Sequence, residues 1–272
     1  PQVVFHAAAL KHVPLCEINI EEAILTNIIG TRVVADACVE AKVKLMVQVS
    51  TDKAVNPTNI MGACKRVGES YAQALGQHYE DTRFITVRFG NVLGSAGSVV
   101  PLFKRQLEAG GPLTVTDPNI TRFFMTIPEA SQLILQSAVA GKGGEIFVLD
   151  MGEPVKISFL AEQMIKLAGK TIDEVGIEYV GLRPGEKLYE ELLIGENVEG
   201  TEHKRIMKAK EISMSWGNLQ VLLGKLKLAM DNVDIASIRE ILLAAPLGFT
   251  PSSEIVDCLW TKSKENNCGK LE

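Results

Sequence analysis

The feature that most constrains the fold of this chain is the regular alternation of short apolar segments with longer segments of helical period. Residues 44–49 and 83–89 are short and rich in apolar, β-branched or aromatic side chains, as expected for buried strands. Residues 17–41 and 59–79 instead repeat apolar side chains at the spacing of amphipathic helices. This alternation predicts βαβ units, right-handed crossovers and a largely parallel sheet.

The rest of the chain extends the pattern and then departs from it. We expect further strands at 3–5 and 145–149, and further helices at 99–109, 128–140 and 158–168. The helix at 17–41 is expected to bend near Gly30, and Ser158 and Gly169 are expected to cap the helix at 158–168. After residue 202, charged segments predict a small helical appendage, with helices at 204–211, 218–230 and 234–243.

Composition and charge narrow the classes of function. The chain has 272 residues, of which 46% are hydrophobic and 22% charged, and this suits one large α/β domain with or without a small lobe. The net charge of −5 gives no sign of nucleic-acid binding. The cysteines form no C-x-x-C pair and the histidines no H-x-x-x-H spacing, so we expect a cytoplasmic setting and no metal site. Because no apolar run is long enough to cross a membrane, we expect a soluble chain.

Residues able to do chemistry follow three of the predicted strands. They come directly after Phe5, after Val49 and after Phe89. In a parallel sheet the carboxyl ends of the strands lie along one edge, and ligands bind beyond that edge. We therefore expect these three stretches to form one shared site.

The stretch after Val49 contains two candidate pairs. Asp52 and Lys53 place an acid beside a base, which could serve proton transfers on neighbouring atoms if their pKa values differ. Taken alone, the same pair is more typical of a solvated turn, because Asp-Lys pairs are common at protein surfaces. Met61 and Lys65 lie four residues apart on one face of the predicted helix. Taken alone, they indicate a core methionine and a surface lysine.

Together these positions resemble the catalytic group of short-chain dehydrogenases/reductases, in which Ser or Thr at a strand end precedes a helical Tyr-x-x-x-Lys. Thr51 and Lys65 match that group, and Met61 stands where tyrosine is usual. Further matches follow in family order, among them H-A-A-A-L-K-H-V-P at 6–14, S-T-D-K-A-V-N-P at 50–57, R-F-G-N-V-L-G-S at 88–95 and R-P-G-E-K at 183–187. The chain thus resembles the CapD-like UDP-N-acetylglucosamine 4,6-dehydratases, which belong to the extended short-chain dehydrogenase/reductase group.

The resemblance implies an α/β fold with part of a Rossmann-type, doubly wound parallel sheet, a smaller substrate-binding lobe and a helical carboxyl-terminal tail. The domains we expect are the remaining part of the NAD(P)-binding domain, with substrate-lobe insertions, at 1–150, a UDP-sugar lobe at 151–201 and a helical appendage at 202–272.

The resemblance also implies an internal redox reaction assisted by NAD or NADP. Hydride leaves sugar C4, a base removes the C5 proton, the C6 hydroxyl departs as water, and hydride returns to C6. By resemblance Lys53 is the C5 base, Asp52 the acid at C6, Thr51 a hydrogen-bonding group near the C4 oxygen, and Lys65 the residue that binds the nicotinamide ribose. Lys53 must be partly neutral to act as a base, so we expect burial or the charge of Lys65 to lower its pKa.

Met61 leaves one proton without an obvious acceptor. A thioether cannot take the proton of the C4 hydroxyl, which tyrosine takes in most short-chain dehydrogenases. That proton must pass to Asp52, to water or through Thr51, and the sequence leaves these alternatives open. A recognisable subgroup of these dehydratases carries methionine at this place.

Other positions match contact residues of the family. The implied cofactor contacts are Ala7, Ala8, Ala9, Lys11, Asn27 and Lys65. The implied substrate contacts are Lys11, Asn91, Gly97, Ser98, Val99, Val100, Arg122, Arg183 and Glu186. Free N–H groups at a helix start suit a pyrophosphate, arginines suit a diphosphate, and a glutamate suits a ribose diol. Ordinary strand packing is the simpler interpretation of the alanines, and surface exposure that of the arginines.

The glycine-rich G-x-x-G-x-x-G loop of the family is absent from this chain. The resemblance places that loop upstream, so we expect the carboxyl-terminal part of a longer enzyme, with an incomplete NAD(P) site and no activity alone. The strand near Val3 would then form an unprotected apolar edge that favours self-association, and we expect a homo-oligomer. Long family members carry an amino-terminal membrane region. A parent of that kind would sit at the inner membrane with this part in the cytoplasm.

Three alternatives to a UDP-sugar 4,6-dehydratase stay open. They are a UDP-sugar 4-epimerase, a non-catalytic nucleotide-sugar binding module and an inactive enzyme. The Asp52-Lys53 pair suits dehydration, and Met61 suits epimerisation poorly. The choice between NAD and NADP, the hexose and the configuration at C5 are not fixed by these residues.

Overall fold

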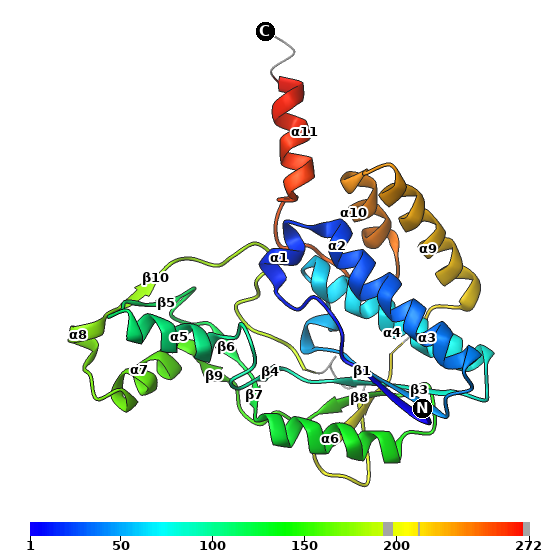
Figure 1. Ribbon diagram of the computed structural model, residues 1–272, viewed down its shortest axis with the longest axis horizontal. Helices are drawn as coiled ribbons and strands as arrows, with labels where there is room; N and C mark the ends of the chain where they lie inside the picture. The colour runs from blue at the N-terminus through cyan, green and yellow to red at the C-terminus, as the bar shows by residue number, and fades with distance from the viewer. Residues whose placement is uncertain (193–197, 212, 269–272) are drawn as a thin grey trace.

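A largely parallel sheet organises the structure, a computed structural model that describes residues 1–192, 198–211 and 213–268 (Figure 1). The sheet order within the described residues is β1 (Val3–His6), β2 (Leu45–Val49), β3 (Arg83–Arg88), β8 (Ile146–Leu149), β12 (Ile206–Ala209) and β11 (Val198–Gly200). Strands β1, β2, β3 and β8 are parallel, whereas β12 and β11 run antiparallel to their neighbours. The expected α/β class with a Rossmann-type parallel sheet is confirmed.

The two faces of the sheet are covered by different helices, because successive strand residues point to opposite sides. Met46 and Phe84 pack into one core with α4 (Ile60–His78), while the next residues along each strand, Val47 and Ile85, pack into another with α6 (Ile127–Ala140). In Figure 1 these helices lie on opposite sides of the strands. Helices α1 (Val13–Glu17), α2 (Ile20–Ile24) and α3 (Gly30–Glu40) also lie on the α4 side.

Two helix boundaries differ from expectation and one agrees. The predicted helix at 17–41 is interrupted by a π-helical turn, η1 (Leu25–Ile29), directly before Gly30, where the bend was expected. Ser158 is not an N-cap, because α7 (Ile157–Leu167) begins one residue earlier, and Lys156 at its N-cap position makes no side-chain cap hydrogen bond. Gly169 does end this helix, with the positive φ of 71° that glycine adopts without strain.

The smaller lobe has its own apolar core, which includes Phe103 and Ile165. Its elements are α5 (Val99–Glu108), β5 (Leu113–Val115), β6 (Thr121–Arg122), β9 (Val155–Lys156), α7, α8 (Ile172–Val175) and β10 (Ile177–Tyr179). Strands β4 (Asn91–Val92) and β7 (Phe124–Met125) pair where the chain passes between body and lobe (Figure 1). The predicted domain limits stay predictions, and residues 193–197 of the second domain lie outside the described residues.

The carboxyl-terminal segment is only partly the helical appendage that we expected. Helices α9 (Trp216–Asp231), α10 (Ile235–Ala244) and α11 (Cys258–Cys268) are present, and Trp216 stacks on His78 of α4 with ring centroids 5.5 Å apart. The predicted helix at 204–211 is wrong, because strand β12 occupies this segment and pairs with β8. Residues 269–272 lie outside the described part of the chain.

Strand β1 is the outer strand of the sheet, as expected. Its Val3 and Phe5 side chains are 42% and 45% exposed, so an apolar edge is present. Self-association through this edge stays a prediction. Among the helices of the described residues, none combines the length and the apolar character needed to cross a membrane.

Candidate functional site

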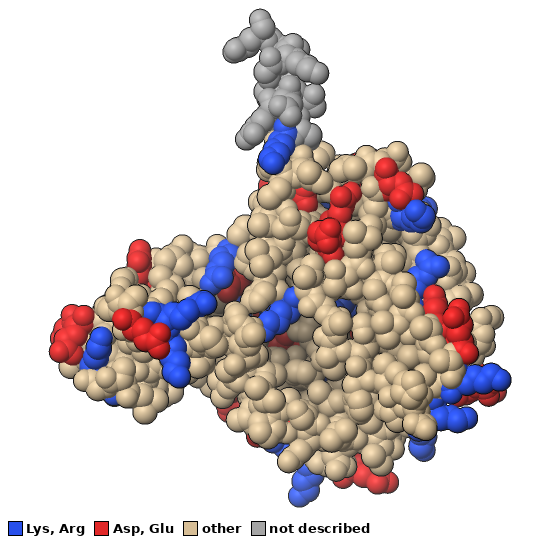
Figure 2. Space-filling view, viewed as in Figure 1, with Lys and Arg blue, Asp and Glu red and all other residues tan. Residues whose placement is uncertain are grey.

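The carboxyl ends of the parallel strands and the lobe enclose a cavity of about 440 Å³. In Figure 2 it opens as a hollow beside the junction of body and lobe. Residues from all three stretches that follow predicted strands line it, among them Ala7, Lys53 and Asn91. The shared site expected at this edge of the sheet is therefore present.

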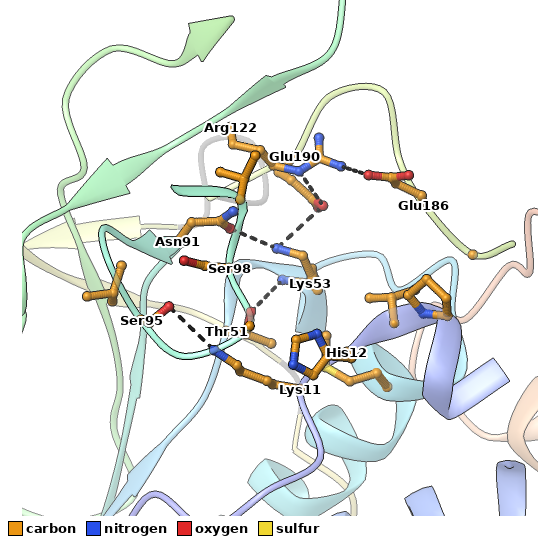
Figure 3. A pocket seen from close by; sticks show the side chains of 18 of the residues that line it. Lys11, His12, Thr51, Lys53, Asn91, Ser95, Ser98, Arg122, Glu186 and Glu190 are labelled. Atoms are coloured by element: carbon orange, nitrogen blue, oxygen red, sulfur yellow. Dashed lines mark hydrogen bonds and ion pairs between the residues drawn. The ribbon is translucent and has the colours of Figure 1, made fainter. Parts of the chain in front are cut away.

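Lys53 occupies the centre of this cavity. Strand β2 leads into a 3-10 turn, η2 (Asp52–Ala54), which is capped by the hydroxyl of Thr51. The Nζ atom of Lys53 lies 2.9 Å from Asp52 Oδ1. It also lies 3.4 Å from Asn91 Oδ1 and 3.5 Å from Glu190 Oε1 (Figure 3). One ammonium group is thus held by two carboxylates and an amide oxygen.

The protonation of Lys53 differs from our expectation. Burial acts to lower its pKa, but the carboxylates of Asp52 and Glu190 outweigh burial and the opposing charge of Arg122. The pKa of Lys53 is therefore raised above its ordinary value, and the predicted lowering is wrong for the ligand-free chain. Lys53 starts as an ammonium ion that must lose a proton before it can act as a base.

Asp52 lies beneath Lys53 and is fully buried. Its Oδ1 accepts hydrogen bonds from Lys53 Nζ and from the Thr51 hydroxyl, the latter at 2.8 Å. Its Oδ2 has no hydrogen-bond partner among the described residues and faces Gly90, where an added Cβ would lie 3.1 Å from this oxygen. Glycine at position 90 leaves room for this carboxylate. Asp52 lies outside the cavity lining, and its contact with the lining is through Lys53.

Met61 and Lys65 line the cavity from α4, as their spacing predicts. Met61 is 3% exposed, which agrees with a packed thioether. Lys65 Nζ donates a hydrogen bond to the carbonyl oxygen of Val49 at 2.6 Å. Burial lowers the pKa of Lys65 to about 8, against the opposing charge of Glu69. The lysine with the lowered pKa is thus Lys65 and not Lys53.

Buried charges support the turn from the side of the sheet. Glu69 of α4 accepts hydrogen bonds from Ser50 Oγ at 2.6 Å and from Arg88 Nε at 2.7 Å. Arg88 also donates to Glu211 at 2.9 Å, and Arg66 pairs with both glutamates. Burial would raise the pKa of Glu69, but its arginine neighbours hold this pKa below the ordinary value. This network fixes Ser50, the residue that leads into the turn with Asp52 and Lys53.

The predicted cofactor positions fall into two groups. Ala7, Ala9, Lys11 and Lys65 line the cavity, whereas Ala8 lies outside its lining. Asn27 is 1% exposed, and its side chain is bound to the backbone of Leu10, accepting from N at 2.8 Å and donating to O at 2.9 Å. Asn27 therefore shapes the loop after β1 without reaching the cavity.

The predicted substrate segment approaches the cavity at the start of α5. Gly97, Ser98 and Val99 line the cavity, and Val100 lies outside its lining. Gly97 has a φ of 69°, and a Cβ there would come within 2.6 Å of the ring of His12. Glycine is required here both by the backbone conformation and by the close approach of that ring.

Basic and acidic side chains meet on the lobe side of the cavity (Figure 3). Arg122 is mostly buried, lies 3.2 Å from Glu186 and 3.7 Å from Glu190, and donates to backbone carbonyls of the segment after Arg183. Arg183 is exposed and lines the same cavity. Arg122 is thus largely occupied by the protein, whereas Arg183 is accessible to a ligand.

Comparison with known proteins agrees with this geometry. A family model described as "Polysaccharide biosynthesis protein" matches residues 1–211. The chain belongs to this family. It is 60% identical to the capsular polysaccharide biosynthesis protein CapD of Staphylococcus aureus over 193 residues, which are 71% of this chain and 32% of that protein. It is 54% identical to the probable polysaccharide biosynthesis protein EpsC of Bacillus subtilis over 217 residues, 79% of this chain and 36% of that protein.

Other similar proteins carry enzyme names. The UDP-glucose 4-epimerase of Rickettsia canadensis is 40% identical over 201 residues, 73% of this chain and 58% of that protein. The X-ray structure of Pen from Bacillus thuringiensis superimposes with a TM-score of 0.71 at 36% identity, covering 82% of this chain and 75% of that one. More distant solved epimerases and dehydratases, several described with NAD, share the fold. The chain spans about a third of the length of CapD and EpsC.

Three residues that form or support the site were not predicted from the sequence. Glu190 follows the R-P-G-E-K stretch by three residues, and its position beyond the recognised motif gave no reason to select it. His12 lies inside the H-A-A-A-L-K-H-V-P stretch and lines the cavity, so the motif itself could have indicated it. Glu69 resembles any other acidic residue of an amphipathic helix.

Proposed function

We propose that this chain carries the catalytic and sugar-binding part of an NAD(P)-dependent UDP-sugar 4,6-dehydratase of polysaccharide biosynthesis. UDP-N-acetylglucosamine is the proposed substrate and a UDP-4-keto-6-deoxy-hexosamine the product. The observation that carries the proposal is the Asp52-Lys53 pair, with Nζ and Oδ1 2.9 Å apart at a strand end and Lys65 lining the same cavity. Similarity to capsular and other polysaccharide biosynthesis proteins supports the pathway.

The residues present fit one end of a dinucleotide. Ala7 and Ala9 leave room at the cavity wall, and the amine of Lys65 lies beside them at the end of β2. When bound, the nicotinamide would take up hydride from the sugar and give it back. Lys65 would bind the nicotinamide ribose and add positive potential, which favours a nicotinamide that accepts hydride.

The proton transfers of the proposed reaction are carried out by side chains of this chain. Lys53 and Asp52 form an ion pair. Movement of one proton from Nζ to the carboxylate would leave an amine and a carboxylic acid. The amine can remove the C5 proton, and the acid can protonate the departing C6 hydroxyl, so that one water leaves and both groups regain their first form. The Thr51 hydroxyl, which lines the same cavity, is proposed to bind the oxygen at C4.

The UDP group is proposed to lie along the lobe side. The start of α5 at Ser98 offers backbone N–H groups, and a helix start favours negative charge. Arg183 supplies an accessible guanidinium. We assign diphosphate contact to Arg183 and to the α5 start, and a supporting role to Arg122, whose donors are bound to protein oxygens.

Mass spectrometry of UDP-N-acetylglucosamine tests this proposal. Incubation with NAD⁺ and the longer protein that contains this chain should yield a nucleotide sugar lighter by one water, and Lys53→Ala should abolish that product. A sugar of unchanged mass that has been inverted at C4 would instead identify an epimerase. The similarity to the Rickettsia protein named UDP-glucose 4-epimerase supports that second candidate.

Two binding experiments on the chain alone complete the test. A non-catalytic binding module would bind UDP, keep that affinity in Lys53→Ala and turn over no sugar in the longer protein. We also expect weak or no binding of NAD⁺ to the chain alone, because the glycine-rich loop is absent from its sequence. Calorimetric titration with an affinity of about 1 μM or tighter would contradict this expectation.

A further inference from the structure

Glu190 is a buried acid inside the cavity for which the proposed reaction has no assigned use. Its side chain is 2% exposed, and its Oε1 lies 3.5 Å from Lys53 Nζ and 3.7 Å from Arg122 Nε. Its Oε2 is buried and has no hydrogen-bond partner among the described residues. A buried carboxylate oxygen without a donor costs free energy, so the position needs a compensating interaction.

The backbone around Glu190 is fixed by the lobe. Thr121 N donates to Leu188 O at 3.2 Å, and Arg122 donates to Lys187 O at 2.9 Å, so this segment is joined to β6. The Lys187 ammonium in turn donates to Asn56 O at 3.0 Å, just after the turn that carries Lys53. Glu190 therefore reaches Lys53 from the lobe side (Figure 3), whereas Asp52 belongs to the same turn as Lys53.

More negative than positive charge faces the Lys53 side chain. Asp52 approaches from the same turn, Glu190 from the lobe side, and Arg122 from β6. Arg122 is itself offset by Glu186, 3.2 Å away. Two carboxylates thus oppose one partly neutralised guanidinium, and the balance favours an ammonium at Lys53.

We infer that Glu190 is a positioning residue that completes a two-carboxylate clamp on the Lys53 ammonium. Asp52 holds Nζ from the strand end, and Glu190 holds it from the lobe, so the amine stays over the cavity in a single place. The clamp itself is independent of the reaction, whereas its consequence for catalysis rests on the proposed function. If Lys53 is the base, the negative charge of Glu190 controls how readily Lys53 Nζ loses its proton.

Titration of Lys53 in the chain tests the clamp directly. The protein is labelled with ¹³C,¹⁵N-lysine, and the Nζ resonance that disappears in Lys53→Arg is followed from about pH 8 to about pH 12.5, because the pKa of Lys53 lies above the ordinary value. Glu190→Gln removes one of the two negative charges and keeps the shape of the side chain. We expect the pKa of Lys53 to fall by about one unit or more in this variant.

Glu186→Gln is the matched control, because Glu186 faces Arg122 and makes no described contact with Lys53. Because Glu186 acts on Lys53 only through Arg122, we expect this variant to lower the pKa of Lys53 by less than about half of the shift in Glu190→Gln. A shift in Glu190→Gln no larger than that of Glu186→Gln would overturn the clamp. If Glu190→Gln does not fold, Glu190→Asp is used in its place. This variant keeps the charge but withdraws it from Lys53 Nζ, so the pKa of Lys53 should still fall, and an unchanged value overturns the proposal.

A second readout connects the clamp to the reaction. In the longer protein, the acid-side limb of the kcat/KM profile should move to lower pH in Glu190→Gln by the same amount as the Lys53 titration. A shifted titration with no dehydration by the parent protein would refute the proposed function and leave the clamp intact. An unshifted Lys53 titration in Glu190→Gln, together with normal dehydration by the parent protein, would refute the clamp and leave the proposed function intact.

Discussion

The two sides of the cavity differ in how much of their charge is accessible. On the sheet side, Asp52, Lys65, Glu69 and Arg88 are at most 5% exposed, and each makes a hydrogen bond to the protein. On the lobe side, Arg122 and Glu190 are likewise buried and paired, but Arg183 is exposed. These sheet-side charges are thus buried, whereas the lobe side adds one cation that is accessible to a ligand.

Substitutions on the two sides should therefore differ in their effect on folding stability. Charges withdrawn from water are stable only while their partners remain, so a loss on the sheet side should affect folding. Exposed charges contribute little to stability and can be exchanged with small effect on the fold. The following substitutions test the contrast, from the largest expected effect to the smallest.

The largest effect is expected for Arg88, which is 1% exposed and bridges Glu69 and Glu211. Arg88→Met leaves both carboxylates without this partner, and we expect the free energy of unfolding to fall by about 3–5 kcal/mol. Urea unfolding measures the change. Arg183→Met, made at an exposed position, should change stability by less than about 0.5 kcal/mol. Equal losses in both variants would remove the contrast between the two sides.

The next effect concerns pH and Lys65. Burial lowers the folded-state pKa of Lys65 to about 8, below the ordinary value of 10.5, so the unfolded chain binds the extra proton between these pH values. Stability due to Lys65 should therefore rise with pH across this window, by about 2 kcal/mol between pH 7 and pH 10. Urea unfolding of the parent and of Lys65→Met at both pH values isolates the change, with the exposed Lys225→Met as control. A parent that gains nothing relative to Lys65→Met contradicts the prediction.

A smaller effect is expected from one hydroxyl on each side. Ser50 Oγ donates to the buried Glu69 carboxylate at 2.6 Å, whereas Ser98 Oγ is buried and has no partner among the described residues. Ser50→Ala should lower the free energy of unfolding by about 1–2 kcal/mol, because it removes a donor from a buried charge. Ser98→Ala should be neutral or slightly stabilising. Thermal unfolding compares the two, and a larger loss in Ser98→Ala would be the opposite outcome.

The smallest effect should appear in binding alone. Arg183→Ala is expected to weaken binding of UDP to the chain by about tenfold, since it removes a charge-assisted contact to the diphosphate. The melting temperature should stay unchanged. Arg105→Ala removes an exposed arginine of the same lobe outside the cavity lining and serves as control in the same calorimetric titration. Equal affinities of both variants would exclude Arg183 from the UDP site.

Much of the fold and the outline of the site could be predicted. The strand segments near Val49 and Phe89 and the helix with Met61 and Lys65 carry strong local periodicity, and they form as expected. Strand β12 was mistaken for a helix, because its four residues, I-M-K-A, give no clear period of two and its pairing partner β8 is distant in sequence. Pairing with the sheet decided its conformation.

Side-chain roles were harder to predict than side-chain positions. Asn27 matched a contact residue, but its amide is bound to the backbone of Leu10. Glu190 gave no local signal and lies 3.5 Å from Lys53 in the folded chain. Each role depends on neighbours that are remote in sequence, which a motif does not list.

The sequence by itself determined the alternation of strands and helices and the edge of the sheet where Asp52, Lys53 and Lys65 would meet. Periodicity and strand order suffice for that, because both are local or topological properties. The tertiary structure alone decided which of the two lysines is more easily deprotonated. A pKa depends on burial and on the charges within a few ångströms, and for Lys53 one of these charges, Glu190, comes from the lobe.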